Sequence, residues 1–103
     1  MNEDRNLQLL KEKIAFIDEL LKEVDFNRLR QWREETLMIL NNLIGEDSKH
    51  YKTFEKISYR SAVIRMMNPE WNRQADIEAC MRGLEEARST LNAIVYGVEQ
   101  SLI

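Results

Sequence analysis

Hydrophobic residues recur along the chain at spacings of three and four positions, which is the period of an α-helix rather than that of a half-buried strand. The pattern is clearest near the N-terminus, and it predicts a first helix over about residues 3–24. The apolar seam of this helix consists of Leu7, Leu10, Ile14, Ile17, Leu21 and Val24. The whole chain is therefore predicted to be all-α.

A second helix is predicted between Asp25 and Gly45. The carboxylate of Asp25 can accept hydrogen bonds from the free amides of a first helical turn. Gly45 can adopt the left-handed conformation that ends many helices, because it has no Cβ. The apolar side of this helix is predicted to carry Leu29, Trp32, Leu40 and Leu43.

Two further helices complete the predicted fold. Asp47 or Ser48 is expected to cap a short third helix, with Tyr51, Phe54 and Ile57 on one face. Residues 58–68 show no clear period, so we assign them no structure. Asn68 followed by Pro69 is typical of a helix start and predicts a long helix over about 69–101. Its main stripe is predicted to be Ile77, Met81, Leu84, Leu91, Ile94 and Val98.

This order of elements predicts a four-helix bundle with a short third helix and a long C-terminal helix. The 103 residues are expected to form a single domain, residues 1–103, because their number is typical of one hydrophobic core. No repeat, linker or low-complexity segment divides the chain.

The charge balance and the cysteine content limit the classes of function. The net charge is −3 and the pI is about 5.2, which argues against nucleic acid as the partner because phosphate binding requires an excess of Lys and Arg. The single cysteine, Cys80, fits a reducing compartment. The N-terminus lacks the pattern of a signal peptide, and no apolar run reaches the ~18 residues that would span a membrane. We therefore expect a cytoplasmic protein without a membrane partner.

The stretch Gly45–His50 is the most chemically varied part of the chain. Ser48 and His50 are two positions apart, so on a helical turn their side chains point in different directions and do not form a nucleophile–base pair. One histidine and a distant Cys80 are too few ligands for zinc. We expect no catalytic residue, metal site or cofactor here, and we interpret the stretch as a corner between two helices. The sequence thus indicates a non-enzymatic protein.

Arginines give the alternative hypothesis. Arginines near Trp32 could form a phosphate-binding patch with a stacking aromatic ring, although Trp32 also fits the core stripe of its helix. The alternative function is a small nucleic-acid-binding protein that uses Arg28, Arg30, Arg60 and Arg65. Arg33 falls on the apolar side of its helix, and we expect it to pair with an acid at residues 45–48 or to extend into solvent.

The sequence pattern makes the first and last helices apolar on more than one side. Small residues at intervals of about four along the last helix would allow another helix to approach closely, and both long helices are expected to extend beyond the core. Exposed apolar faces of this kind usually bind a partner. We predict a homodimer, or binding to another protein, through Leu9, Phe16, Leu20, Ala93 and Gly97.

Several short motifs resemble a known type of domain. They are W-R-E-E-T-L-M-I-L at Trp32–Leu40, I-G-E-D-S at Ile44–Ser48, Tyr51 with Phe54, and A-R-x-x-L-x-A-I at Ala87–Ile94. The set resembles a small helical domain of bacterial and mobile-element proteins that often stands beside TIR-type or nucleotide-sensing modules of anti-phage defence systems. The resemblance implies an accessory interaction module of bacterial or phage origin, linked to phage defence or to its inhibition.

Overall fold

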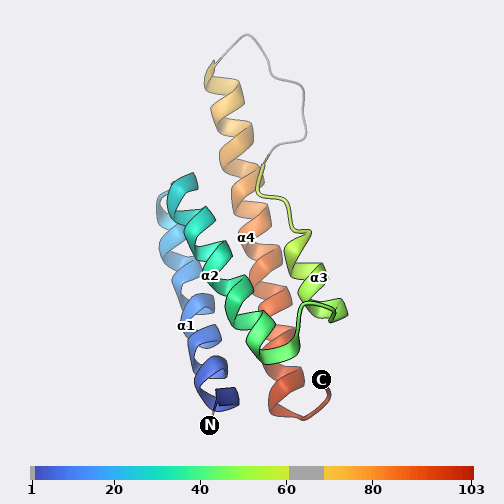
Figure 1. Cartoon of the computed structure of the whole chain (residues 1–103). Coiled ribbons are helices and arrows are strands. Elements are labelled where there is room, and N and C mark those ends of the chain that lie inside the picture. The colour runs from blue at the N-terminus through green and yellow to red at the C-terminus, as the bar shows by residue number, and fades with distance from the viewer. Residues whose placement is uncertain (1, 61–68) are drawn as a thin grey trace.

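The described residues of the computed structural model, 2–60 and 69–103, form four helices arranged as a bundle (Figure 1). The helices are α1 (Asn2–Lys22), α2 (Phe26–Ile44), the short α3 (Lys49–Glu55) and the long α4 (Pro69–Glu99). α1 packs against α2 and α4, and α3 also packs against α2 and α4. The predicted all-α bundle with a short third helix and a long last helix is confirmed.

The helix ends follow the predicted capping residues closely. The side chain of Asp25 accepts hydrogen bonds from the amides of Asn27 and Arg28, at 2.9 and 3.3 Å. Gly45 ends α2 with a φ of 84° and a ψ of 149°. The positive φ was expected, but the ψ is extended rather than left-handed helical, and glycine is the residue that adopts this combination without strain. α4 begins at Pro69, whereas Asn68 lies outside the described residues.

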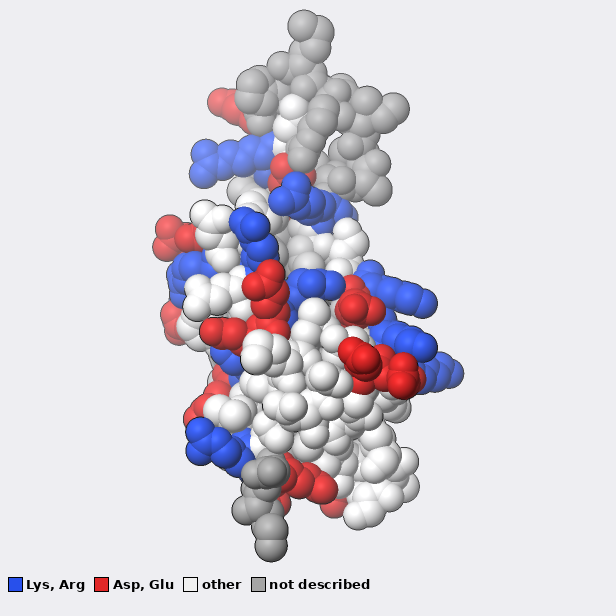
Figure 2. Space-filling view, in the orientation of Figure 1, with Lys and Arg blue, Asp and Glu red and all other residues white. Residues whose placement is uncertain are grey.

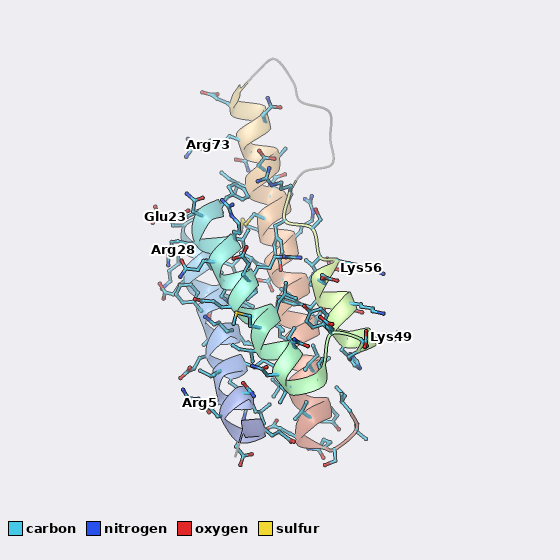
Figure 3. The ribbon with its side chains drawn as sticks, viewed as in Figure 1. Arg5, Glu23, Arg28, Lys49, Lys56 and Arg73 are labelled. Carbon is cyan, nitrogen blue, oxygen red and sulfur yellow. The ribbon has the colours of Figure 1, made fainter. Side chains whose placement is uncertain are left out.

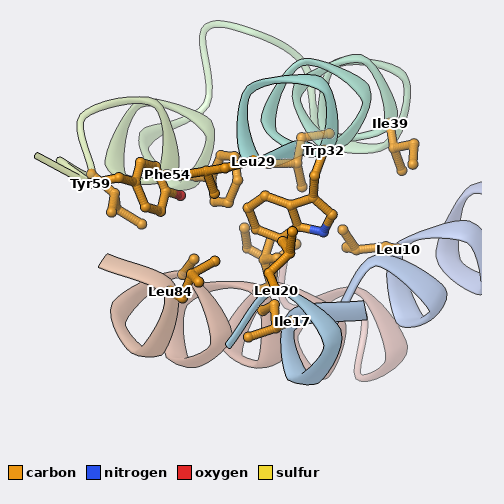
Figure 4. Close-up of a cluster of buried hydrophobic side chains, with 14 of the residues drawn as sticks. Leu10, Ile17, Leu20, Leu29, Trp32, Ile39, Phe54, Tyr59 and Leu84 are labelled. Atoms are coloured by element: carbon orange, nitrogen blue, oxygen red, sulfur yellow. The ribbon is translucent and has the colours of Figure 1, made fainter. Parts of the chain in front are cut away.

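Trp32 lies at the centre of the hydrophobic core (Figure 4). Its ring contacts that of Phe54 from α3, with the two centroids 5.9 Å apart. Its indole Nε1 donates a hydrogen bond to the backbone oxygen of Lys13 in α1, at 2.9 Å. One side chain of α2 therefore contacts both α1 and α3, and the polar end of the buried indole has an acceptor.

The buried stripe of α4 differs from the predicted one at its N-terminal end. The predicted stripe placed Met81 in the core, but this side chain is 43% exposed. At this end of α4 the buried residues are the small Ala79 and Cys80. The observed stripe is Cys80, Leu84, Ala87, Leu91, Ile94 and Val98. At Gly83 the backbone after α3 lies directly on the helix.

The sequence led us to expect that both long helices extend beyond the core, and at the lower end of the bundle α1 and α4 do reach past the end of α2 (Figure 1). At the upper end α1 stops at about the same level as α2, and only the N-terminal part of α4 rises above them. The molecule is correspondingly elongated, with principal extents of 52, 24 and 18 Å. Across residues 2–60 and 69–103, no helix combines the length and hydrophobicity needed to cross a membrane.

Candidate functional site

The Gly45–His50 stretch forms the corner between α2 and α3. Ser48, rather than Asp47, is the N-cap of α3: its hydroxyl oxygen accepts a hydrogen bond from the amide of His50 at 3.2 Å. The Ser48 hydroxyl therefore interacts with the backbone of His50, and the His50 side chain is exposed. Both features are those of a helix start.

The five residues predicted for an interaction surface differ in their exposure. Leu20 is buried in the core, and the space beside Gly97 is filled by the side chain of Ile103. Leu9 is half-buried and packs against the core, whereas Phe16 and Ala93 are exposed. The surface that remains available on this set is therefore provided by Phe16, Ala93 and part of Leu9.

Phe16 lines a shallow groove between α1 and α2 and is already in contact with a cation. The guanidinium carbon of Arg28 lies 5.4 Å from the centroid of its ring, which is a cation–π distance. Figure 3 shows Arg28 on the side of α2 that faces α1, whereas Lys49 and Lys56 extend from the outer side of α3. The groove has a volume of about 180 Å³ and also contains the ion pair of Lys13 with Glu35.

Uncharged residues form a patch near the C-terminal ends of α2 and α4. No Asp, Glu, Lys or Arg occurs in residues 36–45 of α2 or in residues 89–98 of α4. Figure 2 shows the resulting uncharged area over the middle and right of the lower half of the visible face, with charged residues at its left and lower edges. Large apolar side chains are exposed within these segments and just after them: Met38 is 68% exposed, Tyr96 61% and Leu102 71%. We call residues 36–45, 89–98 and 100–103 together the uncharged end.

A second feature, which we call the arginine pocket, lies near the N-terminal end of α2. Its volume is about 310 Å³. α2 contributes residues at helical spacings of three and four, and the segment after α3 contributes three consecutive residues. The lining consists of Phe26, Leu29, Arg30, Arg33, Ser58, Tyr59 and Arg60. Arginines 27 or more positions apart in the sequence thus line one cavity.

The wall formed by residues 58–60 is held in place from two sides. The hydroxyl of Ser58 donates to the backbone oxygen of Arg60 at 3.3 Å and accepts from its amide at 3.4 Å. Beneath this turn, Gly83 allows α4 to approach so closely that an added Cβ would lie 2.6 Å from both the Ser58 oxygen and the ring of Tyr59. The turn therefore rests directly on the backbone of α4.

Tyr59 is buried within this wall, with only 7% of its surface exposed. Its hydroxyl has no hydrogen-bond partner among the described residues. Burial raises the pKa of the hydroxyl far above its ordinary value, against the opposing effect of the nearby Arg33 charge. The phenol therefore stays neutral at physiological pH and remains a donor.

Of the two arrangements expected for Arg33, an ion pair with an acid at residues 45–48 or extension into solvent, the ion pair is not formed. The Arg33 guanidinium donates a hydrogen bond to the backbone oxygen of Glu55 at 2.9 Å, at the C-terminal end of α3, instead of pairing with an acid at residues 45–48. The free carbonyls at a helix C-terminus are natural acceptors for a cation. Arg33 thus ties α2 to the end of α3.

The four arginines of the nucleic-acid hypothesis are not seen on one surface. Arg30 and Arg60 line the arginine pocket, whereas Arg28 lines the groove beside Phe16. Arg65 lies outside the described residues. The sequence signal that could have revealed the pocket is the stripe Phe26, Leu29, Arg30 and Arg33, which shares one helix face. The position of Arg60 beside it depends on the angle between α2 and α3.

The described part of the chain contains no cluster suited to binding a metal ion, and its cysteine is buried. Cys80 is buried in the core, and this burial raises the pKa of its thiol, which lowers its reactivity. No three His, Cys, Asp or Glu side chains come together as a metal site there. None of the protein-family models, curated proteins or solved structures compared with the chain matches it.

Proposed function

We propose that the protein is a non-enzymatic helical interaction module that forms a homodimer through its uncharged end. The supporting observation is the exposure of Met38, Tyr96 and Leu102 in segments that lack charged residues. Interfaces bury such side chains readily because no charge has to lose its water, and aromatic residues and methionine are enriched there. The free Cys80 is buried, and no cluster of His, Cys, Asp or Glu that could hold a metal ion occurs in the ranges 2–60 and 69–103; we propose a binding role in the cytoplasm.

A second copy of the same chain is the partner that best fits this surface. A two-fold axis brings one patch against itself, so the patch has to be compatible with its own charges. An uncharged patch meets this condition, whereas a patch carrying charges of one sign would repel its copy. From the motif resemblance alone, we further propose that the module is of bacterial or phage origin and is linked to phage defence or to its inhibition.

Light scattering coupled to size-exclusion chromatography tests the proposal. At tens of micromolar, the wild type should have twice the chain mass of 12.3 kDa. Met38→Glu, Tyr96→Glu or both should shift the protein toward the monomer, because burying an unpaired carboxylate is costly. Gln8→Glu, which adds the same charge at an exposed site of α1, is the matched control and should remain dimeric.

A monomeric wild type, or a dimer that neither substitution weakens, would contradict self-association through this end. A monomer would leave the uncharged end to a different protein. Circular dichroism of each variant separates a broken interface from a broken fold, since both substituted side chains are more than half exposed and should tolerate a polar replacement.

A further inference from the structure

The arginine pocket combines three cations with an apolar floor, and the chain uses none of these cations in an ion pair with a described carboxylate. Arg30 donates one hydrogen bond, to the side-chain oxygen of Asn27 at 3.1 Å. Arg33 donates to the Glu55 backbone, and the guanidinium carbon of Arg60 lies 6.0 Å from the ring centroid of Phe26. A guanidinium has five N–H donors, so most of those in the pocket are free for a ligand.

A shortage of acids does not explain the unpaired arginines. The chain has 18 acidic residues against 15 basic ones, and cations elsewhere do find carboxylates. Arg88, for example, pairs with Asp18 across the α1–α4 interface and also with Glu85. Three guanidinium groups therefore lie around one cavity in a chain whose net charge is negative, and an anion bound between them would relieve their mutual repulsion.

We propose that the arginine pocket binds a small molecule carrying a phosphate or carboxylate group on an apolar or aromatic body. The planar guanidinium fork matches both oxyanions and can bind either through two parallel hydrogen bonds. Phe26 and Leu29 give the organic part of the ligand a hydrophobic surface. The neutral Tyr59 ring completes this floor.

The size of the cavity favours a small molecule over a macromolecule. Its volume of about 310 Å³ lies at the lower end of the range for small-ligand sites. Its walls are fixed by contacts already described: the Ser58–Arg60 hydrogen bonds, the seat on Gly83 and the Arg33–Glu55 bond. A preformed site of this kind binds its ligand at a low conformational cost.

Phenyl phosphate and benzoate are suitable probes, because each has one oxyanion and one aromatic ring. Titration calorimetry or amide chemical shifts should detect at least one of them binding to the wild type with a Kd of about 1 mM or tighter. Inorganic phosphate should bind at least about tenfold more weakly, because it cannot use the apolar floor. Higher salt should weaken all of these interactions.

Arg30→Gln and Arg60→Gln should each weaken the bound probe by about tenfold or more, since a hydrogen bond between charged groups is lost. Arg28→Gln is the matched control. Arg28 is on the same helix as Arg30 and, like Arg60, lies over an aromatic ring, but it lines the groove beside Phe16 and not the arginine pocket. Its replacement should therefore leave the affinity unchanged.

Three results would overturn the proposal. The first is that the folded wild type binds neither probe at a probe concentration of about 10 mM, ten times the expected upper limit of Kd. The second is an equal loss of affinity in Arg28→Gln, which would indicate nonspecific charge attraction. The third is tight, salt-dependent binding of a single-stranded oligonucleotide without binding of either probe, which would assign the arginines to nucleic acid.

Discussion

Gly83 and Gly97 both lie inside α4, where glycine costs about 1 kcal/mol relative to alanine. The neighbours of the two glycines differ in kind. Gly83 is faced by a backbone atom, the oxygen of Ser58, which an added Cβ would approach to 2.6 Å. Gly97 is faced only by the end of the Ile103 side chain, and a side chain of this kind can rotate away. The same residue type therefore has a structural role at one position and a small cost at the other.

This difference predicts opposite results for one substitution. Gly83→Ala should destabilise the protein by about 1–3 kcal/mol, because the 58–60 turn has to move. Gly97→Ala should be neutral or stabilise it by up to about 1 kcal/mol through helix propensity. Urea denaturation of both variants gives the comparison. A stabilising Gly83→Ala would show that the turn does not rest on α4 as described.

Ion pairs join the helices along their exposed edges. Lys11 pairs with Glu99 of α4 at 2.9 Å, and Lys13 pairs with Glu35 of α2 at 2.6 Å. Asp18 of α1 pairs with Arg88 of α4. Such half-exposed pairs contribute little to stability individually, about 0–1 kcal/mol, but they select one alignment of neighbouring helices.

The pair between Lys13 and Glu35 gives a pH-dependent prediction. The hydrogen bond from Lys13 lowers the pKa of Glu35 below its ordinary value. Because the folded-state pKa is lower than the unfolded one, the pair stabilises the fold at neutral pH, and this contribution is lost as the pH falls through the lowered pKa. Glu35→Gln should therefore cost up to about 1 kcal/mol at about pH 7 and almost nothing at about pH 2.

Denaturation curves of Glu35→Gln and of the wild type at the two pH values measure this effect. Glu34→Gln is the matched control, because Glu34 is the exposed neighbour on the same helix and forms no ion pair with the residues described. A destabilisation by Glu35→Gln that is equally large at both pH values would indicate lost packing rather than a lost charge.

The helices could be predicted from the sequence because their signals are local. Asp25, Gly45 and Pro69 mark helix ends through their own backbone and side-chain chemistry, and the period of the apolar residues marks the buried faces. The reasons for the two glycines, the partner of Arg33 and the arginine pocket could not be predicted. Each depends on which distant segment lies opposite, and this is set by the angles between packed helices.

At the scale of the whole molecule, Trp32 joins the helices into a single core. Its ring is surrounded by residues of α1, α3 and α4, including Leu20, Phe54 and Leu84 (Figure 4). Its indole hydrogen bond to Lys13 adds a polar link to α1. We therefore expect the bundle to unfold as one cooperative unit.

Replacement of Trp32 should weaken the whole bundle. Trp32→Ala should cost about 3–5 kcal/mol, and Trp32→Phe about 1–2 kcal/mol for the lost hydrogen bond and volume. Phe16→Ala, at a ring that is 36% exposed, is the control and should cost much less.

In a Trp71→Phe background, the emission of Trp32 should be blue-shifted in the native state. A red-shifted native emission would show that the indole is exposed to water.

All five charged residues of α2 lie within residues 28–35, and none follows in residues 36–45. The centres of the two halves are about 13.5 Å apart along the helix axis, which is longer than the Debye length of about 8 Å at physiological ionic strength. A charge that enters the arginine pocket is therefore largely screened at the uncharged end. The rigid helix separates the two surfaces, so occupancy of one should leave the affinity of the other unchanged, with a coupling free energy near zero.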